Sequence, residues 1–224
     1  MMSPNPNDWK TSLFPDDFSI PLEKYSDYDS YGHVSCPAWK SWSSNVWTFK
    51  QSFDVELQFE SLSNRLYSNL DQELFNNYIY TNNDWLDGPL PVVQLCWSIL
   101  FWTDEKNVWI EQIPDPNLSR VGLELISASF PISAWTRPVV TAFKILDLDK
   151  KIILERGTPL CNIRFYSDKN NDKFILEQKD PPQKVIDNLS KDSEVKRWQK
   201  NYSWSLINKR LDKQSKCPFS RWWK

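Results

Sequence analysis

The sequence predicts a mainly β protein of the α+β class: an antiparallel β-sandwich or jelly-roll-like body with a C-terminal helix. Two observations carry this prediction. From residue 46 to residue 176, short runs that alternate apolar and polar side chains recur about every ten residues, as in an antiparallel sandwich or barrel. After Pro181-Pro182 the apolar residues recur at helical spacing instead. Nothing in the chain resembles the alternating βαβ units of a parallel sheet.

The N-terminal half begins with an irregular segment and continues with strands. Residues 1–37 are rich in Pro, Asn, Asp and Ser, which favours an extended arm. The apolar residues of this arm lead us to expect that it lies against the body or against a neighbouring subunit. Residues 46–50 and 53–59 alternate apolar and polar side chains and predict two strands. Leucines at four-residue intervals in 61–83 indicate a helix or an elaborated loop.

The central part of the chain predicts a series of further strands. Residues 91–102 and 108–110 are β-rich and flank a polar turn, which predicts a β-hairpin. Further strands are expected at 120–130, 139–148, 151–154, 160–166 and 173–176. We expect the strands 139–148 and 151–154 to form a second hairpin.

The C-terminal segment, 181–224, is predicted to be helical with a basic tail. Asp192 or Ser193 is expected to cap a second helix within it. We expect its Trp198/Tyr202 face to pack on the sheet and its basic face to stay in solvent. The chain is therefore expected to divide into an extended Pro-rich arm (1–37), a sandwich domain (38–180) and this helical segment (181–224).

Composition excludes several classes of function. A single histidine, His33, cannot build a multi-histidine metal site within one subunit, and four glycines leave little material for glycine-rich phosphate loops. We therefore expect no metal and no cofactor. The net charge of −2 provides no general attraction to nucleic acid or to an anionic membrane, so neither is expected as a partner.

The expected location is the cytoplasm. The four cysteines are scattered without a C-x-x-C spacing and are interpreted as buried small hydrophobes. The N-terminus lacks the basic and apolar regions of a signal peptide. The longest apolar stretch, 92–102, contains Gln94 and Ser98 and is too short to span a bilayer.

Two groups of motifs resemble a known family. The run Cys36-Pro37-Ala38-Trp39, followed by Asn45-Val46-Trp47 and Ser52-Phe53-Asp54, is similar to an opening motif of uncharacterised proteins of T4-like phages of marine bacteria. The runs 135–138 (Trp-Thr-Arg-Pro) and 155–161 (Glu-Arg-Gly-Thr-Pro-Leu-Cys) resemble strands of the same group and of a related bacterial family of unknown function. The resemblance implies a phage or marine-microbe origin and a β-sandwich-like body. It also places the protein in an infected host cell or in the virion, and it implies no catalytic residues.

One candidate site gathers three arginines beside a tryptophan. Trp135 and Arg137 precede the second predicted hairpin, Arg156 follows it, and Arg164 lies on the next strand. Guanidinium groups bind carboxylate or phosphate with two parallel hydrogen bonds and stack on aromatic faces, so these four residues predict a pocket for an anionic aromatic ligand. The alternative is that the arginines pair with nearby acids, namely Asp147, Asp149 and Glu155.

Other residues suggest further sites. Exposed tryptophans are platforms for sugar rings or bases, and we expect one or two to face a ligand, while Trp97 and Trp109 fill the core. The candidates are Trp39, Trp42, Trp47, Trp85, Trp97, Trp102 and Trp109. His33 and Cys36 form a nucleophile pair only if the fold brings them together. Acid pairs for a glycosidase-like mechanism could come from Asp54, Glu56, Glu111 and Glu124.

Two functions remain open from the sequence. The first is a non-enzymatic binding or interaction module whose aromatic and arginine-lined surface contacts a small anionic or aromatic ligand, a glycan or a protein, including a second copy of the chain. The second is a small metal-independent enzyme that acts on an aromatic, amino-acid or sugar substrate through carboxylates or an Arg/Trp pocket. A fold of this class does not decide between them.

Overall fold

The computed structural model describes residues 22–25, 36–81, 86, 90–168, 173–198 and 202–215. Side chains are described for these residues except 98, 192–198, 202–204 and 212–215. Most of the arm expected over 1–37 lies outside the described residues, together with His33 and Trp85. The expected packing of the Trp198/Tyr202 face also concerns side chains that are not described. The three-part division of the chain therefore stays a prediction.

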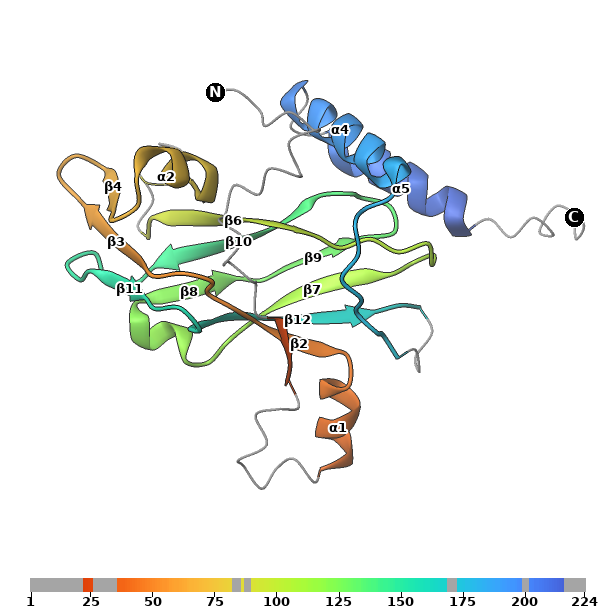
Figure 1. Cartoon of the computed structure of the whole chain (residues 1–224), viewed down its shortest axis with the longest axis horizontal. Helices are drawn as coiled ribbons and strands as arrows, with labels where there is room; N and C mark the ends of the chain where they lie inside the picture. Colours follow the sequence, from red (N-terminus) through yellow and green to blue (C-terminus); the bar gives the residue numbers. More distant parts are fainter. Residues whose placement is uncertain are drawn as a thin grey trace, which may run out of the picture.

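Within the described residues the strands form three antiparallel sheets (Figure 1). The five-stranded sheet has the order β1 (Leu22–Lys24), β2 (Val46–Lys50), β12 (Pro159–Tyr166), β7 (Trp109–Pro114) and β9 (Ala128–Pro131). The four-stranded sheet has the order β5 (Ile79–Tyr80), β6 (Val92–Leu100), β10 (Pro138–Ile145) and β8 (Leu123–Ile126). The three-stranded sheet has the order β11 (Ile152–Leu154), β3 (Val55–Glu60) and β4 (Arg65–Ser68). These sheets confirm the mainly β, α+β class.

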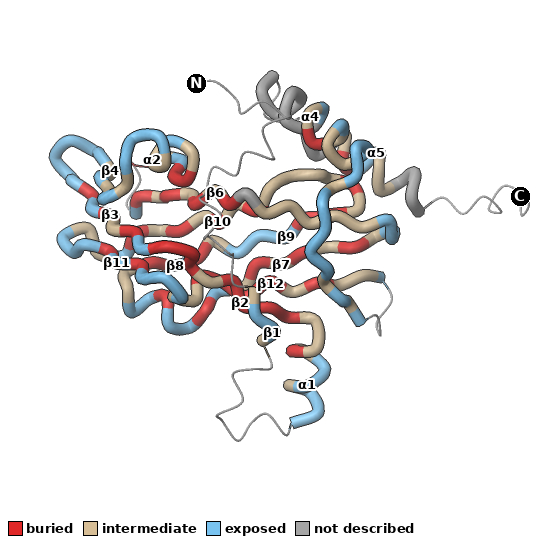
Figure 2. Tube along the Cα trace, in the orientation of Figure 1, coloured by how far each residue is buried: buried red, intermediate tan, exposed pale blue. Residues whose placement is uncertain are grey.

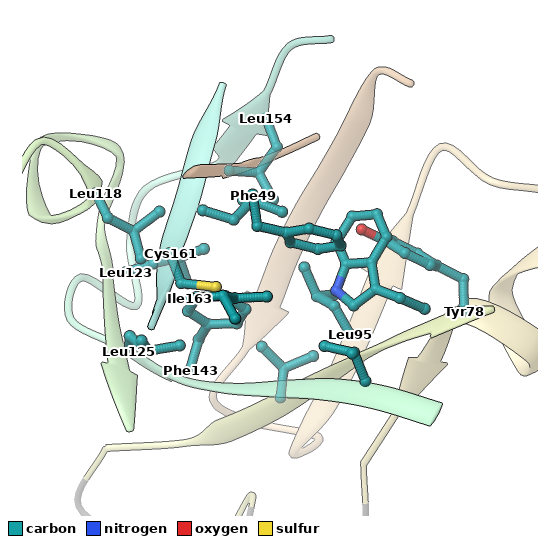
Figure 3. Close-up of a cluster of buried hydrophobic side chains, with 14 of the residues drawn as sticks. Phe49, Tyr78, Leu95, Leu118, Leu123, Leu125, Phe143, Leu154, Cys161 and Ile163 are labelled. Atoms are coloured by element: carbon teal, nitrogen blue, oxygen red, sulfur yellow. The ribbon is translucent and has the colours of Figure 1, made fainter. Parts of the chain in front are cut away.

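The five-stranded and four-stranded sheets pack face to face around the main core. Phe49 on β2 makes an edge-to-face contact with Trp97 on β6, with ring centroids 4.5 Å apart. The buried Gln112 side chain on β7 donates from Nε2 to the Val140 carbonyl of β10 at 2.9 Å, which joins the two sheets by a polar contact. Figure 3 shows Phe49, Tyr78 and other apolar side chains filling this space.

A bent two-stranded ribbon connects the three-stranded sheet to the five-stranded sheet. β2 continues into β3, and β11 continues into β12, so that both pairs of strands belong to one irregular ladder. At the bend, Gln51 N–H donates to Thr158 O and Gly157 N–H donates to Gln51 O, both at 2.8 Å. Gly157 has a φ of 89°, a left-handed conformation that glycine adopts readily.

The helices have clear local causes. The helix α1 (Pro37–Ser43) has a proline in its first turn, and α2 (Gln72–Tyr78) is capped by Asp71, whose side chain accepts the Leu74 N–H at 2.8 Å. The 3₁₀ helix η4 (Leu118–Val121) ends at Gly122. Figure 1 shows α1 projecting from the body, and Figure 2 shows that most of α1 is exposed.

The expected pair of C-terminal helices is present as α4 (Gln183–Trp198) and α5 (Tyr202–Ser215). The break falls after Trp198 and not at Asp192 or Ser193, because α4 continues through both of these residues. Among the described residues, no helix combines the length and the apolar surface needed to cross a lipid bilayer.

Both predicted hairpins are wrong. β6 pairs with β5 and β10, whereas β7 pairs with β12 and β9, so residues 101–108 cross from one sheet to the other. Similarly, β10 and β11 belong to different sheets. Apolar residues of the crossing explain the first error: Phe101 packs on Phe165, with ring centroids 5.1 Å apart, so this connection helps to close the core.

Three other predicted elements differ in detail. The run 120–130 is split into η4, β8 and the start of β9, because the chain changes sheets at Ser127. Residues 61–83 contain β4 and β5 as well as α2, so two strands were missed there. Residues 173–176 form no strand. They run extended, with Phe174 and Leu176 packed toward the core and the Phe174 N–H donated to Asn45 Oδ1 at 3.1 Å.

Candidate functional site

A tight turn after β9 builds the candidate site. The Pro131 carbonyl accepts the N–H of Ala134 at 3.2 Å and the N–H of Trp135 at 2.8 Å, which forms a single helical turn. The Ser133 N–H donates to the carbonyl of Val108 at 3.4 Å and holds this turn against the start of β7. The chain then enters β10 directly, so the residues between the turn and the strand have a defined position.

Arg137 lies between this turn and β10, packed on two aromatic rings. Its guanidinium carbon lies 4.5 Å from the ring centroid of Trp135 and 5.4 Å from that of Phe130. The two rings contact each other edge to face, with centroids 5.9 Å apart. Such cation–π contacts are favourable and hold a guanidinium in place. We call Phe130, Trp135 and Arg137 the Arg137 site.

The charge of Arg137 has no anionic partner in the described part of the chain. No Asp or Glu side chain among the described residues forms an ion pair with it, and its one hydrogen bond runs from Nε to the adjacent Pro138 carbonyl at 3.4 Å. Burial against the two rings lowers the pKa of Arg137, because it disfavours the charged form. Arg137 is thus a partly desolvated cation without a counter-charge in the part of the chain that the structure describes.

The end of the guanidinium nevertheless reaches the surface. Among the described residues, Ser52 Oγ is the one side-chain polar atom that is fully buried without a hydrogen-bond partner. The terminal nitrogens Nη1 and Nη2 of Arg137 have no acceptor among the described residues and are not fully buried. The half-buried guanidinium can therefore still donate to a ligand through these nitrogens.

A second arginine lies beside the same turn. Arg210 of α5 donates from Nη1 to the carbonyl of Ala134 at 2.9 Å. This contact ties α5 to the turn that precedes Arg137. The contribution of α5 was not predicted from the sequence, because a helix and a turn so far apart in the chain meet only in the folded structure. Phe130 was also missed, although it directly precedes the turn-forming proline.

The structure does not bring the other two predicted arginines to Arg137. Arg164 lies on β12 opposite Glu111 on β7, with Nη1 and Oε2 3.4 Å apart, and its guanidinium carbon lies 5.7 Å from the Tyr166 ring centroid. Because side chains alternate along these strands, Arg164 faces the outer side of the five-stranded sheet, away from Phe130.

Arg156 lies at the other end of β12, in the exposed turn that follows β11. Its backbone N–H donates to Asp54 Oδ1 at 2.7 Å. The three guanidiniums therefore do not converge, because the chain that separates them does not fold as a hairpin. The expected partners Asp147, Asp149 and Glu155 do not pair with these arginines either.

The tryptophans divide between the core and the surface. Trp97 is buried and donates from Nε1 to Thr141 Oγ1 at 3.1 Å, as expected for a core residue. The expectation that Trp109 fills the core is wrong: it faces outward, half-buried, and stacks on Tyr166 with ring centroids 6.3 Å apart. Trp47 is buried. Trp39, Trp42 and Trp102 are half-buried. Trp39 and Trp42 contact each other and Tyr25.

The candidate carboxylates do not form a facing pair. Glu111 lies on the outer side of the five-stranded sheet and pairs with Arg164, whereas Glu124 lies on the outer side of the four-stranded sheet and pairs with Lys144. Two sheets therefore separate them. Asp54 accepts a backbone N–H in the bend, and Glu56 pairs with Lys151.

Cys36 is exposed at the start of α1, where the backbone N–H groups of Trp39 and Ala38 lower its pKa. Its expected partner His33 lies outside the described residues, so the structure does not test this pair. Nowhere in the described part of the chain do three or more His, Cys, Asp or Glu side chains gather closely enough to hold a metal ion.

The fold and the Arg137 site define this chain as a mainly β, α+β protein with an arginine held on aromatic rings at the end of a sheet. No protein-family model matches the chain, and neither a curated protein nor a solved structure matches it. Kinship with marine phage proteins, and the location that it implies, stay predictions.

Proposed function

We propose that this protein is a binding module that holds an anionic group of its ligand at Arg137, beside the rings of Trp135 and Phe130. One observation carries this proposal: a guanidinium that is partly desolvated, has no counter-charge among the described residues, and has terminal nitrogens that are not fully buried. A desolvated charge is unfavourable unless it is paired. An anion from a ligand supplies both the charge and the missing acceptors.

Other cations in the chain provide an internal comparison. Four basic side chains on the strands or next to them pair with acids across the sheet: Lys50 with Glu23, Lys144 with Glu124, Lys151 with Glu56 and Arg164 with Glu111. Lys24, Arg65 and Arg156 have no acid partner among the described residues, but these side chains are exposed and water solvates their charges. Arg137 differs from both groups because it is half-buried and still has no acid partner among the described residues, which supports a ligand as the partner.

The alternative of a carboxylate-dependent enzyme receives less support from the geometry. Glu111 and Glu124 lie on opposite outer sides of the two packed sheets, and a glycosidase-like mechanism needs two acids across one cleft. The Arg137 site has a cation and two aromatic rings, which bind and orient an anion. It contains no acid, base or nucleophile of its own.

An NMR titration tests the proposal. The probes are benzoate and phenyl phosphate at low ionic strength, and the signals are the Trp135 indole N–H and the Arg137 Nε–H in ¹H–¹⁵N spectra. A single bidentate pair between charged groups gives affinities in roughly the millimolar range, which NMR measures well. We expect saturable shifts of both signals with at least one probe.

Variants assign the binding to the arginine. Arg137→Gln removes the charge and should weaken binding by at least about tenfold. Arg156→Gln is the matched control, because it removes the same charge from an exposed turn at the other end of β12. It should bind like the unmodified protein. The proposal is wrong if neither probe binds, or if the Arg137→Gln protein binds as tightly as the control.

A further inference from the structure

We infer that the group held at Arg137 is a carboxylate attached to a flat apolar body, and not a phosphate ester. This inference rests on the proposed function and names the class of ligand. Three features of the site carry it: the donors that remain available, the donors that are already engaged, and the apolar surface beside the guanidinium.

The available donors match the two oxygens of a carboxylate. Nε of Arg137 is directed to the Pro138 carbonyl at 3.4 Å, which leaves the edge formed by Nη1 and Nη2. Two N–H groups on this edge are parallel and lie in the plane of the guanidinium. A carboxylate accepts both in a planar, bidentate arrangement. This arrangement satisfies each oxygen without any other protein donor.

A phosphate can use the same edge of the guanidinium for two of its oxygens, but its third oxygen needs further donors. Protein sites for phosphate use several backbone N–H groups that converge on the three oxygens, as at helix N-termini and in nests. In the turn beside Arg137, the N–H groups of Ser133, Ala134 and Trp135 are already donated to the carbonyls of Val108 and Pro131. Pro138, which follows Arg137, has no N–H. These four residues therefore offer no free backbone N–H group to a tetrahedral anion.

The surroundings of the guanidinium favour a ligand with low hydration. Phe130 is buried and Trp135 is half-buried, so an anion that binds here loses water on the side of the rings. A carboxylate carries one negative charge, whereas a phosphate ester carries between 1.5 and 2 at neutral pH and is more costly to dehydrate.

A flat apolar body fits the same geometry. A bidentate carboxylate lies in the plane of the guanidinium, which packs on Trp135 with 4.5 Å between the guanidinium carbon and the ring centroid. In an aromatic acid the ring is conjugated with the carboxylate and continues this plane. The ligand ring then lies beside the aromatic rings on which the guanidinium packs, and apolar contacts with these rings are favourable.

Four probes separate the contributions in the NMR titration: benzoate, acetate, benzamide and phenyl phosphate. We expect benzoate to bind at least about fivefold more tightly than phenyl phosphate and than acetate. Benzamide, which has the ring without the charge, should cause no saturable shift. Arg137→Gln should abolish the preference for benzoate, and Arg156→Gln should preserve it. Trp135→Leu should reduce benzoate to the affinity of acetate.

The outcomes distinguish this inference from the proposed function. If phenyl phosphate binds as tightly as benzoate and its binding requires Arg137, the carboxylate assignment is overturned while the anion-binding function stands. If benzoate binds no better than acetate, the flat apolar body is overturned. If no anion shows binding that depends on Arg137, both the inference and the proposed function fail. Because the comparison of benzoate with acetate uses the unmodified protein, it holds even if Trp135→Leu does not fold.

Discussion

Replacement of Arg137 by methionine should stabilise the protein while it removes binding. Methionine is unbranched, has about the reach of the arginine stem, and packs well against aromatic rings. It fills the space beside Trp135 and Phe130 without a charge. A residue whose removal raises stability and abolishes binding is one that serves function at the expense of the fold.

The magnitude follows from two opposing terms. Removing a desolvated ion relieves a penalty of several kcal/mol when the ion is fully buried, and less here because the terminal nitrogens reach solvent. Removing the cation–π contacts with Trp135 and Phe130 loses about 0.5–2 kcal/mol. We expect a net gain of about 1 kcal/mol in the free energy of unfolding. For a chain of 224 residues this corresponds to about 2–4 °C in Tm.

The sign of the pH dependence follows from the lowered pKa of Arg137. The folded state holds this proton less tightly than the unfolded state, so the charged guanidinium destabilises the fold at every pH below the lowered pKa. The penalty disappears only as the pH rises through that pKa. Because arginine stays charged in the neutral range, the gain from Arg137→Met should be constant between about pH 6 and pH 9.

Urea denaturation followed by circular dichroism measures the change. Arg164→Met is the matched control, because it removes a half-exposed guanidinium that is paired with Glu111, and we expect a change within about 0.5 kcal/mol. A loss of about 1 kcal/mol or more in Arg137→Met, with little change in the control, would refute the reasoning. It would mean that the Arg137 guanidinium stabilises the fold through a partner in the protein.

Three further predictions concern the body of the protein. Ser52→Ala should leave stability unchanged or raise it by up to about 1 kcal/mol in urea denaturation, because the buried Ser52 hydroxyl has no partner; a loss above about 1 kcal/mol would contradict this. Gly157→Ala should cost about 1–2 kcal/mol in the same assay through its φ of 89° alone, since nothing lies within 4 Å of the added methyl group; an unchanged midpoint would count against the bend. In iodoacetamide labelling followed by mass spectrometry, Cys36 should react quickly because it is exposed and its pKa is lowered, whereas burial raises the pKa of Cys161, which should react only on unfolding; equal rates would disprove both placements.

The strand pattern was predictable where one face of a strand is buried and the other is not. In β3 the buried residues Val55, Leu57 and Phe59 alternate with more exposed ones, as period-two alternation requires. Pairing between strands was not predictable in the same way. A polar turn between two apolar runs looks the same whether the runs pair or enter opposite sheets, and β6 and β7 enter opposite sheets.

The candidate site shows the same division between local and long-range information. The contact of Arg137 with Trp135 joins residues two positions apart, so the sequence could suggest it. The face on which Arg164 lies depends on the register of β12, and a shift of one residue reverses it. Arg210 reaches the turn only because α5 docks there, which no local pattern encodes.

A crystal structure of the protein with benzoate tests the central claim most directly. We expect both carboxylate oxygens at about 2.7–2.9 Å from Nη1 and Nη2 of Arg137, with the benzoate ring beside the indole of Trp135. Benzoate bound elsewhere, or an Arg137 guanidinium paired with a carboxylate of the protein itself, would contradict the claim.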